Sequence, residues 1–600
     1  MCGIVGFIDN RNKEEKTEIL HNMMERIHHR GPNSGGTFIG KRAAIGFRRL
    51  SIIDLEGGSQ PLYNETGNLV LTFNGEIYNY KEIREDLIAK GHIFKTNTDS
   101  EVIVHGYEEY GKDVVKKFRG MFGFIIWDIE KRELFGARDM FGIKPFYYMN
   151  NGDAFLYGSE IKSFIEHPSF KKELNKDALK SYMTFGYGAS EETFFKGVYK
   201  LRPGHYFTWK DGQMDIERYA SINFAPDTLK DMKASLKEIN DIMDNSVNFH
   251  AGADVGVGSF LSGRIDSAYI TKDLKPAMTF TVAYEGGDLE AIEHAKEYSK
   301  ILGAENISRV ITAEEFFDIM ETIQYHCDEP YGDPSAVSNY CLSMLAKGHV
   351  TVVLSGEGAD EVFAGYDEYL EGYKNNKPVE QWYFGHQCVF DDLEANTVLT
   401  DLYKNGTTAF EIAKKYYDEV KDLDNVSKQQ YLDIVLRLPN DVLLKADKMA
   451  NAHCIEGRNP FLDKEVIKVC ESLPEVCKIN GESTKYALRV ASEEIISENL
   501  EHKPKNKFSV PFGTWLKEEK WYLKVKEFFS EEFVSEFFKT DAIIDLLDDH
   551  FKGNADNGEK IYLIYAFLVW YKVFFILVNM WIYQGASRVE VLLFSWFLLI

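Results

Sequence analysis

At 600 residues the chain is longer than a single hydrophobic core normally organises, so we expect a globular protein of several domains. Its formal net charge of −25 argues against a general nucleic-acid-binding protein, which needs a basic surface to displace counterions from phosphates. The 7 cysteines are scattered and lack metal-ligand spacing, so they predict neither a disulfide framework nor a zinc site and are typical of the reducing cytoplasm.

The chain opens with MCGIVGF, which lacks the basic and apolar regions of a secretory signal and places a cysteine directly behind the first methionine. Removal of that methionine would leave Cys2 with both a thiol and the α-amino group. These groups titrate near about 8.5 and about 7.7–8.0, close enough for the amine to act as general base for a thiol nucleophile. The alternative is that Cys2 is a small apolar residue buried in a first strand.

The first third of the chain alternates short apolar and aromatic segments with glycine and asparagine turns. The strand-like segments are GIVGFID, AAIGFRRLSIID, NLVLTFNGEIYN, GMFGFIIWD, ELFGARD and AFLYGSE. This pattern predicts antiparallel sheets, with helices over residues 17–28, 81–90 and 99–110. We therefore expect an α+β domain of stacked antiparallel sheets over residues 2–215, because the pattern becomes irregular between residues 216 and 230.

Within this domain the segment TFNGEIYNY offers donors suited to a tetrahedral oxyanion, namely the side-chain amide of Asn74 and the N–H of Gly75. The neighbouring carboxylate of Glu76 could hold a substrate ammonium. Asn-Gly is also the commonest hairpin turn, so a plain turn is the alternative interpretation.

Beyond residue 231 the pattern changes to strands and helices in alternation. VGVGSFL is followed by a helix from Asp266, AMTFTVAY by a helix over residues 289–302, and a further strand is VTVVL. This alternation predicts a parallel sheet with crossover helices, whose ligands lie at the carboxyl ends of the strands. Residues from about 367 onward are predicted to be mostly helical, and we place this second domain at residues 231–575.

Two loops of this second domain have the composition of phosphate-binding turns. SGRIDS follows the strand VGVGSFL, and SGEGADEVFAGY follows VTVVL. Small residues between a strand and a helix aim backbone N–H groups at phosphate, so the pair predicts a nucleotide site. For either loop alone, a plain strand-to-helix turn with an aspartate cap is the alternative.

The C-terminal region is strongly apolar, with IYLIYAFLVWYKVFFILVNMWIY followed by QGASRVE and VLLFSWFLLI. Lys572 interrupts the first stretch, and the last is shorter than the roughly 20 residues needed to span a bilayer. We therefore favour a buried terminal helix, followed by an atypical hydrophobic tail over residues 576–600, above a membrane anchor.

The motifs MCGIVG, HRGPNSGG, RRLSIID, NGEIYNY and NTDSE, in this order, resemble the N-terminal-nucleophile glutaminase domain of glutamine-dependent amidotransferases. The resemblance implies a sandwich of the N-terminal-nucleophile hydrolase type. It also implies that Cys2 attacks the carboxamide of glutamine and that Asn74 and Gly75 stabilise the oxyanion. Arg49, Glu76 and Asp99 would hold the α-carboxylate and α-ammonium of glutamine, and the products would be glutamate and ammonia.

The second half resembles the ATP-pyrophosphatase domain of glutamine-hydrolysing asparagine synthetases, an α/β domain of the adenine nucleotide α-hydrolase type with a helical C-terminal part. The segments that carry this resemblance are SGRIDS, DEPYGDPSA, SGEGADEVFAGY, LLKADKMANAHCIEGRNPFLD, TKYALR and KPKNKFSVPFGTWL. It implies ATP-dependent adenylation of aspartate, followed by attack of ammonia to give asparagine, AMP and pyrophosphate. The small-molecule substrates would then be glutamine, aspartate and ATP, and the resemblance suggests a homodimer.

The resemblance also assigns residues of this second site. The predicted ATP-binding residues are Leu261, Ser262, Gly263, Asp266, Ser267, Val282, Ser355 and Gly356, with Asp266 and Asp360 reaching Mg²⁺. Glu357 is expected to accept a proton from the attacking ammonia, and Lys485 to stabilise developing charge. A solvated helix lysine is the alternative for Lys485.

One departure falls in the pyrophosphate loop, where Arg264 stands in place of the second glycine of the family pattern S-G-G-x-D-S. If that position needs a left-handed backbone, a side chain there costs about 1–2 kcal/mol, although arginine can itself bind phosphate. Two alternatives to a working synthetase therefore stay open. They are a glutaminase-competent relative whose synthetase half is impaired or regulatory, and an ATP-dependent amide former that acts on another carboxylate.

Overall fold

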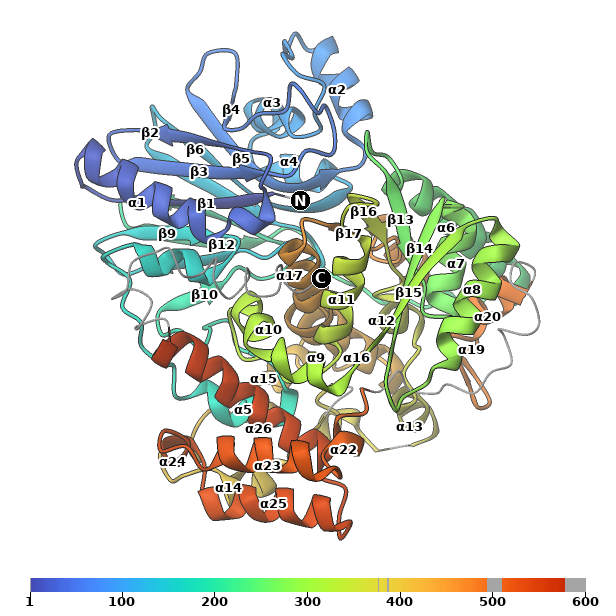
Figure 1. The fold of residues 1–600 in the computed structure, drawn as a ribbon. Helices are drawn as coiled ribbons and strands as arrows, with labels where there is room; N and C mark the ends of the chain where they lie inside the picture. Colours follow the sequence, from blue (N-terminus) through green and yellow to red (C-terminus); the bar gives the residue numbers. More distant parts are fainter. Residues whose placement is uncertain (1, 376, 386–387, 494–509, 578–600) are drawn as a thin grey trace.

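The computed structural model describes residues 2–375, 377–385, 388–493 and 510–577. Two stacked antiparallel sheets form the N-terminal part, drawn blue to cyan in Figure 1, and a parallel sheet flanked by helices lies beside them. The predicted fold class, an α+β domain followed by an α/β domain with a helical C-terminal part, is confirmed. Residues 503–509, the first part of the segment KPKNKFSVPFGTWL, lie outside the described residues.

The N-terminal sandwich consists of two six-stranded sheets. The first has the order β10-β8-β9-β1-β3-β2 and the second β12-β11-β7-β6-β5-β4. The strands are β1 Gly3–Ile8, β2 Ser34–Ile39, β3 Ala43–Arg49, β4 Leu62–Tyr63, β5 Leu69–Ile77, β6 Gly120–Asp128, β7 Glu133–Arg138, β8 Tyr147–Asn150, β9 Phe155–Gly158, β10 Val198–Lys200, β11 His205–Lys210 and β12 Gln213–Arg218. The strand β12 continues to Arg218, past the residue at which we expect the first domain to end.

Apolar side chains from both sheets fill the space between them, among them Ile4, Phe47, Val70, Ile125 and Phe207. Because successive side chains of a strand point to opposite faces, each sheet also offers an outer apolar face for helices. The helices of this part are α1 Lys13–Arg26, α2 Tyr80–Ala89, α3 Glu101–Tyr110, α4 Val114–Lys117 and α5 Ala178–Phe185. α1 packs against β1 and β3, and α3 packs against β5.

Two helix starts differ from the predicted bounds for identifiable reasons. α1 begins at Lys13 instead of residue 17, because the side chain of Asn12 accepts a hydrogen bond from Glu15 N and Glu15 bonds back to Asn12 N. α3 begins at Glu101 instead of residue 99, because the carboxylate of Asp99 is used elsewhere and accepts a bond from Ile77 N in β5.

The parallel sheet has the order β15-β14-β13-β16-β17. Its strands are β13 Val257–Phe260, β14 Met278–Tyr284, β15 Glu305–Ile311, β16 Val352–Leu354 and β17 Glu456–Arg458. β13 pairs with both β14 and β16 in parallel, so the two glycine-rich loops that follow β13 and β16 leave the same edge side by side. Strands β15 and β17 are not predicted by the sequence pattern, and β17 is short and polar.

Helices cover this sheet and form most of the chain beyond residue 367. They are α6 Met232–His250, α7 Ile265–Leu274, α8 Glu290–Leu302, α9 Ala313–Asp318, α10 Met320–Cys327, α11 Ala336–Ala346, α12 Ala359–Phe363, α13 Glu368–Lys374, α14 Asp392–Val398, α15 Ala409–Tyr417, α16 Asn425–Leu432, α17 Leu443–Ala452, α18 Lys464–Ser472, α19 Glu475–Lys478, α20 Tyr486–Glu493, α22 Phe512–Trp515, α23 Glu519–Phe529, α24 Val534–Phe537, α25 Thr540–Lys552 and α26 Gly558–Tyr571. A π-helical segment, Asp433–Val442, leads into α17, and a short hairpin pairs β18 Ile479–Asn480 with β19 Ser483–Thr484.

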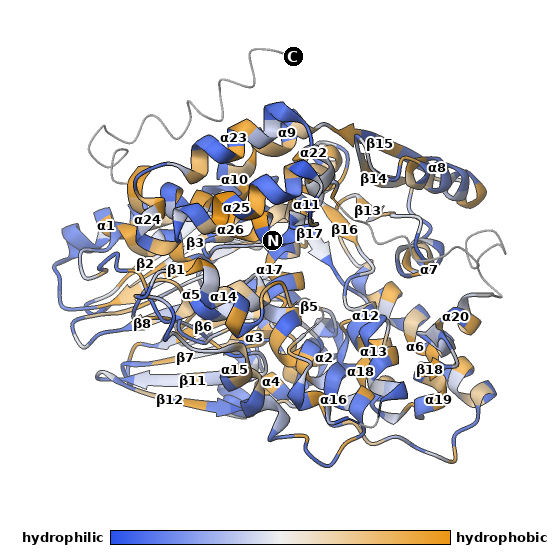
Figure 2. Cartoon of the chain, turned by 90° about the horizontal axis from the view of Figure 1, so that it is seen from below, coloured by the Kyte–Doolittle hydropathy of each residue, from blue (hydrophilic) through white to orange (hydrophobic). Residues whose placement is uncertain are grey.

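The apolar C-terminal helix is part of the core. The stretch Gly558–Leu577 is long and apolar enough to cross a membrane, but 67% of its most apolar window is buried inside the protein. α26 contacts α10, α22 and α25, and Figure 2 shows it as a hydrophobic helix among them. Trp570 Nε1 donates to Asp328 O at 2.7 Å, which fixes the helix on the α10 side. The predicted buried terminal helix is confirmed, whereas residues 578–600 of the tail lie outside the described residues.

Candidate active sites

Cys2 lies at the start of β1, half-buried, between the two sheets. Its backbone N donates to Asn74 Oδ1 at 3.1 Å, and its Sγ lies 3.8 Å from Leu50 O. Burial raises the pKa of the Cys2 thiol to about 11, against the opposing effect of the positive amino terminus. The thiol is therefore protonated at neutral pH, so attack on a substrate requires a base that removes its proton.

Asn74 and Gly75 lie beside Cys2 within strand β5, where they pair with Gly123 and Phe122 of β6. The hairpin-turn interpretation of Asn-Gly is therefore wrong. Asn74 is fully buried, and its Nδ2 has no hydrogen-bond partner among the described residues, so this donor is available to a ligand. Gly75 has φ of +151°, and a Cβ there would lie 2.0 Å from Met121 O, so only glycine fits.

The carboxylates of Glu76 and Asp99 lie next to these donors, and both residues are buried. Burial and the nearby carboxylates of Asp99 and Glu456 raise the pKa of Glu76 well above its usual value. Burial raises the pKa of Asp99 to about 7, although a hydrogen bond from Ile77 N favours its charged form. A ligand ammonium placed here would favour the charged form of both groups.

The charge around Cys2, Asn74 and Glu76 is partly set by the second half of the chain. Arg458, at the end of β17, places Nη2 3.3 Å from Glu76 Oε1 and Nε 2.6 Å from Glu456 Oε1. Burial opposes ionisation of Glu456, but the positive amino terminus and Arg458 outweigh it and hold the pKa of Glu456 at about 2. Neither residue is predicted as a site residue from the sequence. Both lie in the segment IEGRNPFLD, which carries part of the resemblance to the synthetases.

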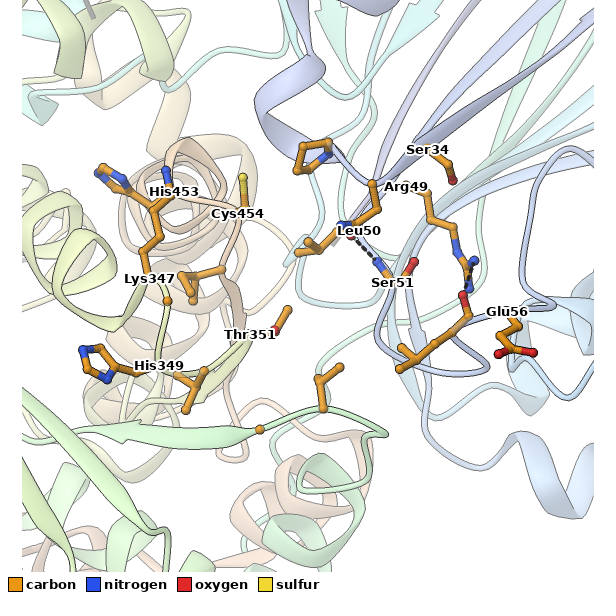
Figure 3. Close-up of a pocket in the computed structure, with 18 of the residues that line it drawn as sticks. Ser34, Arg49, Leu50, Ser51, Glu56, Lys347, His349, Thr351, His453 and Cys454 are labelled. Carbon is orange, nitrogen blue, oxygen red and sulfur yellow. Dashed lines mark hydrogen bonds between the residues drawn. The ribbon is translucent and has the colours of Figure 1, made fainter. Parts of the chain in front are cut away.

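Arg49 is buried at the end of β3, and its guanidinium donates to carbonyls of the following loop, including Asp54 O at 2.7 Å and Leu55 O at 3.2 Å. It lines a cavity of about 860 Å³ between the two halves of the molecule. Figure 3 shows Ser34, Arg49 and Glu56 on one side and Lys347, His349 and His453 on the other. Leu50, whose carbonyl faces the Cys2 thiol, also lines this cavity.

Further buried ion pairs join the two halves near Cys2. Arg30 donates to Cys2 O at 3.1 Å from Nε and to Glu160 Oε1 at 2.8 Å from Nη1. Its Nη2 lies 2.9 Å from Asp447 Oδ2 in α17. Arg119 Nε likewise donates to Asp463 Oδ2 at 2.7 Å. These contacts hold the glutamine site against the helical part of the second half.

The loop between β13 and α7 contains Ser262, Gly263 and Arg264, and Ser267 follows in the first turn of α7. Ser262 N donates to Ser267 Oγ at 3.1 Å, and Gly263 has φ of +73°, so the left-handed turn falls on a glycine. Arg264 has φ of −95° and ψ of 158°, an extended conformation open to any residue. Position 264 therefore does not need a left-handed backbone, and the cost that a side chain would have in that case does not apply.

Three of the predicted residues meet at the carboxyl edge of the parallel sheet. Lys485 Nζ lies 2.6 Å from Asp266 Oδ1 and 2.9 Å from Asp360 Oδ1. Lys485 is only 2% exposed, so the solvated-lysine interpretation is wrong. Burial lowers its pKa, but the two carboxylates outweigh this and the net shift is upward, so the ammonium stays charged. Its φ of +50° is unusual for a non-glycine residue and is typical of functional sites.

The second loop packs directly on the first. A Cβ on Gly356 would lie 2.8 Å from the Cβ of Asp266, so the close approach of the loops requires glycine there. Ser355 N donates to Arg458 O at 3.0 Å, and Ser355 Oγ donates to Asn459 Oδ1 at 3.1 Å. On the neighbouring strand pair, Leu261 O accepts a bond from Thr281 Oγ1 at 2.7 Å, and the following residue, Val282, is buried.

Glu357 follows these residues and is half-buried. Burial raises its pKa, with Asp360, Asp333 and Asp441 adding to the effect and Lys445 opposing it. Lys445 Nζ donates to Asp333 Oδ2 at 2.6 Å and to Ser335 Oγ at 2.8 Å, both in the segment DEPYGDPSA. This segment therefore forms a charged wall beside Glu357, with one cation and several carboxylates.

The fold and the two sites define a glutamine amidotransferase joined to a nucleotide-binding α/β domain. Residues 1–220 match the glutamine amidotransferase domain family, and residues 238–572 match the asparagine synthase family. The chain is 37% identical to asparagine synthetase [glutamine-hydrolyzing] 1 of Bacillus subtilis, over 96% of this chain and 97% of that protein. It is 33% identical to a putative asparagine synthetase [glutamine-hydrolyzing] of Mycobacterium tuberculosis, over the same shares of the two chains. The chain belongs to the family of glutamine-hydrolysing asparagine synthetases, enzymes of glutamine-dependent asparagine synthesis.

A solved structure with some likeness is the glutamine phosphoribosylpyrophosphate amidotransferase of B. subtilis, at 18% identity and a TM-score of 0.28. The matched region covers 51% of this chain and 65% of the B. subtilis amidotransferase. The TM-score is too low to support a conclusion about fold or function.

Proposed function

We propose that this chain makes asparagine from aspartate, ATP and glutamine, with the residue roles given below. The observation that carries the proposal is the meeting of Lys485 with Asp266 and Asp360 where two parallel strands end, because a buried ammonium between two carboxylates is built to handle phosphate charge. The remaining contacts of both sites support it.

In the first site, the Cys2 thiol attacks the carboxamide carbon of glutamine after losing its proton to a base, which is the α-amino group once the first methionine is removed. The new S–C bond places negative charge on the carboxamide oxygen. Asn74 Nδ2 and Gly75 N–H stabilise this oxyanion. Expulsion of ammonia leaves a thioester, and water hydrolyses the thioester to glutamate and free thiol.

Recognition of glutamine in this site uses opposite charges at its two α-groups. Glu76 and Asp99 hold the α-ammonium, and Arg49 holds the α-carboxylate from the wall of the interdomain cavity. Arg458 forms an ion pair with Glu76 and so favours the charged form of one of the two carboxylates.

In the second site, the side-chain carboxylate of aspartate attacks the α-phosphorus of ATP, which releases pyrophosphate and gives an aspartyl adenylate. Ser262, Gly263 and Ser267 bind the departing phosphates, while Leu261, Val282, Ser355 and Gly356 surround the nucleoside. Asp266 and Asp360 offer converging carboxylate oxygens, which suit Mg²⁺. When bound, that ion neutralises phosphate charge.

Ammonia then attacks the adenylate carbonyl and displaces AMP to form asparagine. Glu357 accepts the proton that the nitrogen loses, a role that a raised pKa suits. Ammonia must reach this point uncharged. An apolar cluster between the sites, which includes Leu50, Met121 and Ile143 of the first half with Val442 and Leu443 of the second, suits that passage. We further propose the cytoplasm as the location and a homodimer as the assembly.

The test is pyrophosphate release from Mg²⁺ and ATP, with ammonium chloride supplied so that Cys2 is bypassed. Release that requires aspartate and is accompanied by asparagine supports the proposal. Release with another acid instead would favour an amide former with a different substrate. No release would favour an impaired synthetase half. Because Arg264 adopts an extended backbone, we expect Arg264→Gly to change the rate by less than about threefold.

A further inference from the structure

A cluster of four potential metal ligands lies in the first half, outside both sites described above. One ligand atom from each of Glu65, His92, His105 and Glu108 lies within 4.8 Å of all the others. Glu65 follows β4, His92 follows α2, and His105 and Glu108 lie three residues apart on α3 and so on one face of that helix. Three segments separated in sequence thus converge on one point.

A buried ring nitrogen of His105 faces this point. It is 1% exposed, and its Nε2 lies 3.4 Å from Glu101 Oε1. Its Nδ1 lies 3.1 Å from Glu65 Oε2 but has no hydrogen-bond partner among the described residues. If Nε2 carries the proton toward Glu101, the Nδ1 lone pair faces a carboxylate, and the two repel unless a cation lies between them.

His92 is oriented in a similar way, except that its Nδ1 forms a hydrogen bond with Glu65. Its Nδ1 lies 3.0 Å from Glu65 Oε1, and its Nε2 lies 3.6 Å from Glu109 Oε2. Each imidazole therefore turns Nδ1 toward Glu65 and has a carboxylate behind Nε2. This is the geometry of metal-binding histidines, whose second nitrogen is oriented by an outer carboxylate. The outer carboxylate of Glu101 is itself held by Lys95 N and Thr96 N, each at 2.8 Å.

We propose that Glu65, His92, His105 and Glu108 bind one divalent transition-metal ion, with Zn²⁺ as the ion best suited. Two imidazole nitrogens with carboxylate oxygens form a donor set that Zn²⁺ accepts in tetrahedral geometry, whereas Mg²⁺ and Ca²⁺ prefer oxygen ligands alone. Glu65 and Glu108 are exposed, so the ion can enter from solvent. The ion would brace the segment from His92 to Asp99, which ends at a residue of the glutamine site.

The test uses the full chain, freed of metal by a chelator and then titrated with Zn²⁺ by calorimetry. We expect wild type to bind one more equivalent than the double variant His92→Asn, Glu108→Gln, which counts this site separately from any thiol. Zn²⁺ should also raise the thermal midpoint of wild type but not of the variant. Glu85→Gln, an exposed glutamate on α2, is the matched control and should behave as wild type.

Co²⁺ provides a second measurement, since tetrahedral coordination gives intense visible absorption that depends on the ligands. We expect this absorption in wild type and its loss in Glu108→Gln alone, an exposed position whose change leaves the fold intact. Glu109→Gln should weaken Zn²⁺ binding by about tenfold through His92. Equal stoichiometry and equal Co²⁺ spectra in wild type and both ligand variants would overturn the proposal. They would leave a protonated His105 paired with Glu65 and Glu101 as the explanation of the cluster.

Discussion

The glutamine site and the nucleotide site differ in where their charges come from. The nucleotide site is assembled around one sheet, because parallel order places the loops after β13 and β16 side by side and Lys485 joins the two. The glutamine site takes its proposed nucleophile and oxyanion donors from one domain, whereas Arg458, the cation that pairs with Glu76, comes from the other. A site built on adjacent loops can be recognised from motifs, whereas a charge supplied across an interface cannot.

The largest expected effect is the loss of glutaminase activity, with synthetase activity retained, when Cys2 is replaced. Cys2→Ala should lower glutamate release from glutamine by at least about 10³-fold, because the nucleophile is lost. Asparagine formation from ammonium chloride should stay within about twofold of wild type. Parallel assays of both activities check this. Retained glutaminase activity in Cys2→Ala would show that another residue carries the attack.

Replacing Lys485 should have the opposite outcome, with synthetase activity lost and glutaminase activity retained. Lys485→Ala should lower aspartate-dependent pyrophosphate release by about 10²–10³-fold, because the buried ammonium beside Asp266 and Asp360 is lost. Glutaminase activity should be retained. Lys468→Ala, at an exposed position on α18, is the matched control. The assignment fails if both lysine variants release pyrophosphate at the rate of wild type.

Arg458 tests whether the glutamine site depends on the other domain. Arg458→Met should raise the KM for glutamine by about 10–100-fold and lower the free energy of unfolding by about 3–5 kcal/mol, because Glu76 and Glu456 lose their buried partner. Glutaminase kinetics and denaturant unfolding measure the two effects. Arg458→Lys should rescue part of both. An unchanged KM in a destabilised Arg458→Met protein would limit Arg458 to a structural role.

The smallest effect concerns pH. Because the pKa of Asp99 is about 7 in the folded chain, its carboxylate gains charge between pH 6 and 8. The KM for glutamine should fall by up to about tenfold over that range, since the α-ammonium then meets a fuller negative charge. Asp99→Asn should flatten this profile.

As pH rises, ionisation of Asp99 should strengthen glutamine binding but lower the stability of the folded chain. A raised folded-state pKa contributes stability below the unfolded pKa, near 3.8, that is lost as pH rises through about 7. Urea unfolding of wild type and Asp99→Asn across this range measures the difference. A stability difference that does not depend on pH would contradict the assigned shift.

Sequence patterns predicted most of the fold, because local patterns determine it, and they also named residues that the structure brings together, such as Lys485, Asp266 and Asp360. Cys2, the two glycine-rich loops and TKYALR each lie at a recognisable strand end, whereas Asn74 and Gly75 lie inside β5. The backbone of Arg264 could not be predicted, because the left-handed position falls on Gly263 and only coordinates show which residue of the loop takes it. Arg458 was missed because its partner Glu76 lies in the other domain, far away in the sequence.

The metal cluster shows the same limit more strongly. The spacing of the cysteines predicts no zinc site. The converging potential ligands are instead histidines and glutamates from three segments of the first half. The HxxE spacing of His105 and Glu108 on α3 was visible, but nothing in the sequence connects it with Glu65 or His92. Only the packing of α3 against the turn after β4 brings them together.

The buried ion pairs across the interface have a consequence for how the chain can be divided. The guanidinium of Arg30 donates to both Glu160 and Asp447. Lys162 Nζ lies 2.8 Å from Oδ1 of Asp328, which belongs to the other half. Cutting the chain after β12 would leave cations and carboxylates in apolar surroundings without their counterions, at a cost of several kcal/mol for each. Although the two halves have separate chemistries and separate sheets, neither is a portable module that could be transplanted to another enzyme without redesigning the face it presents to its neighbour.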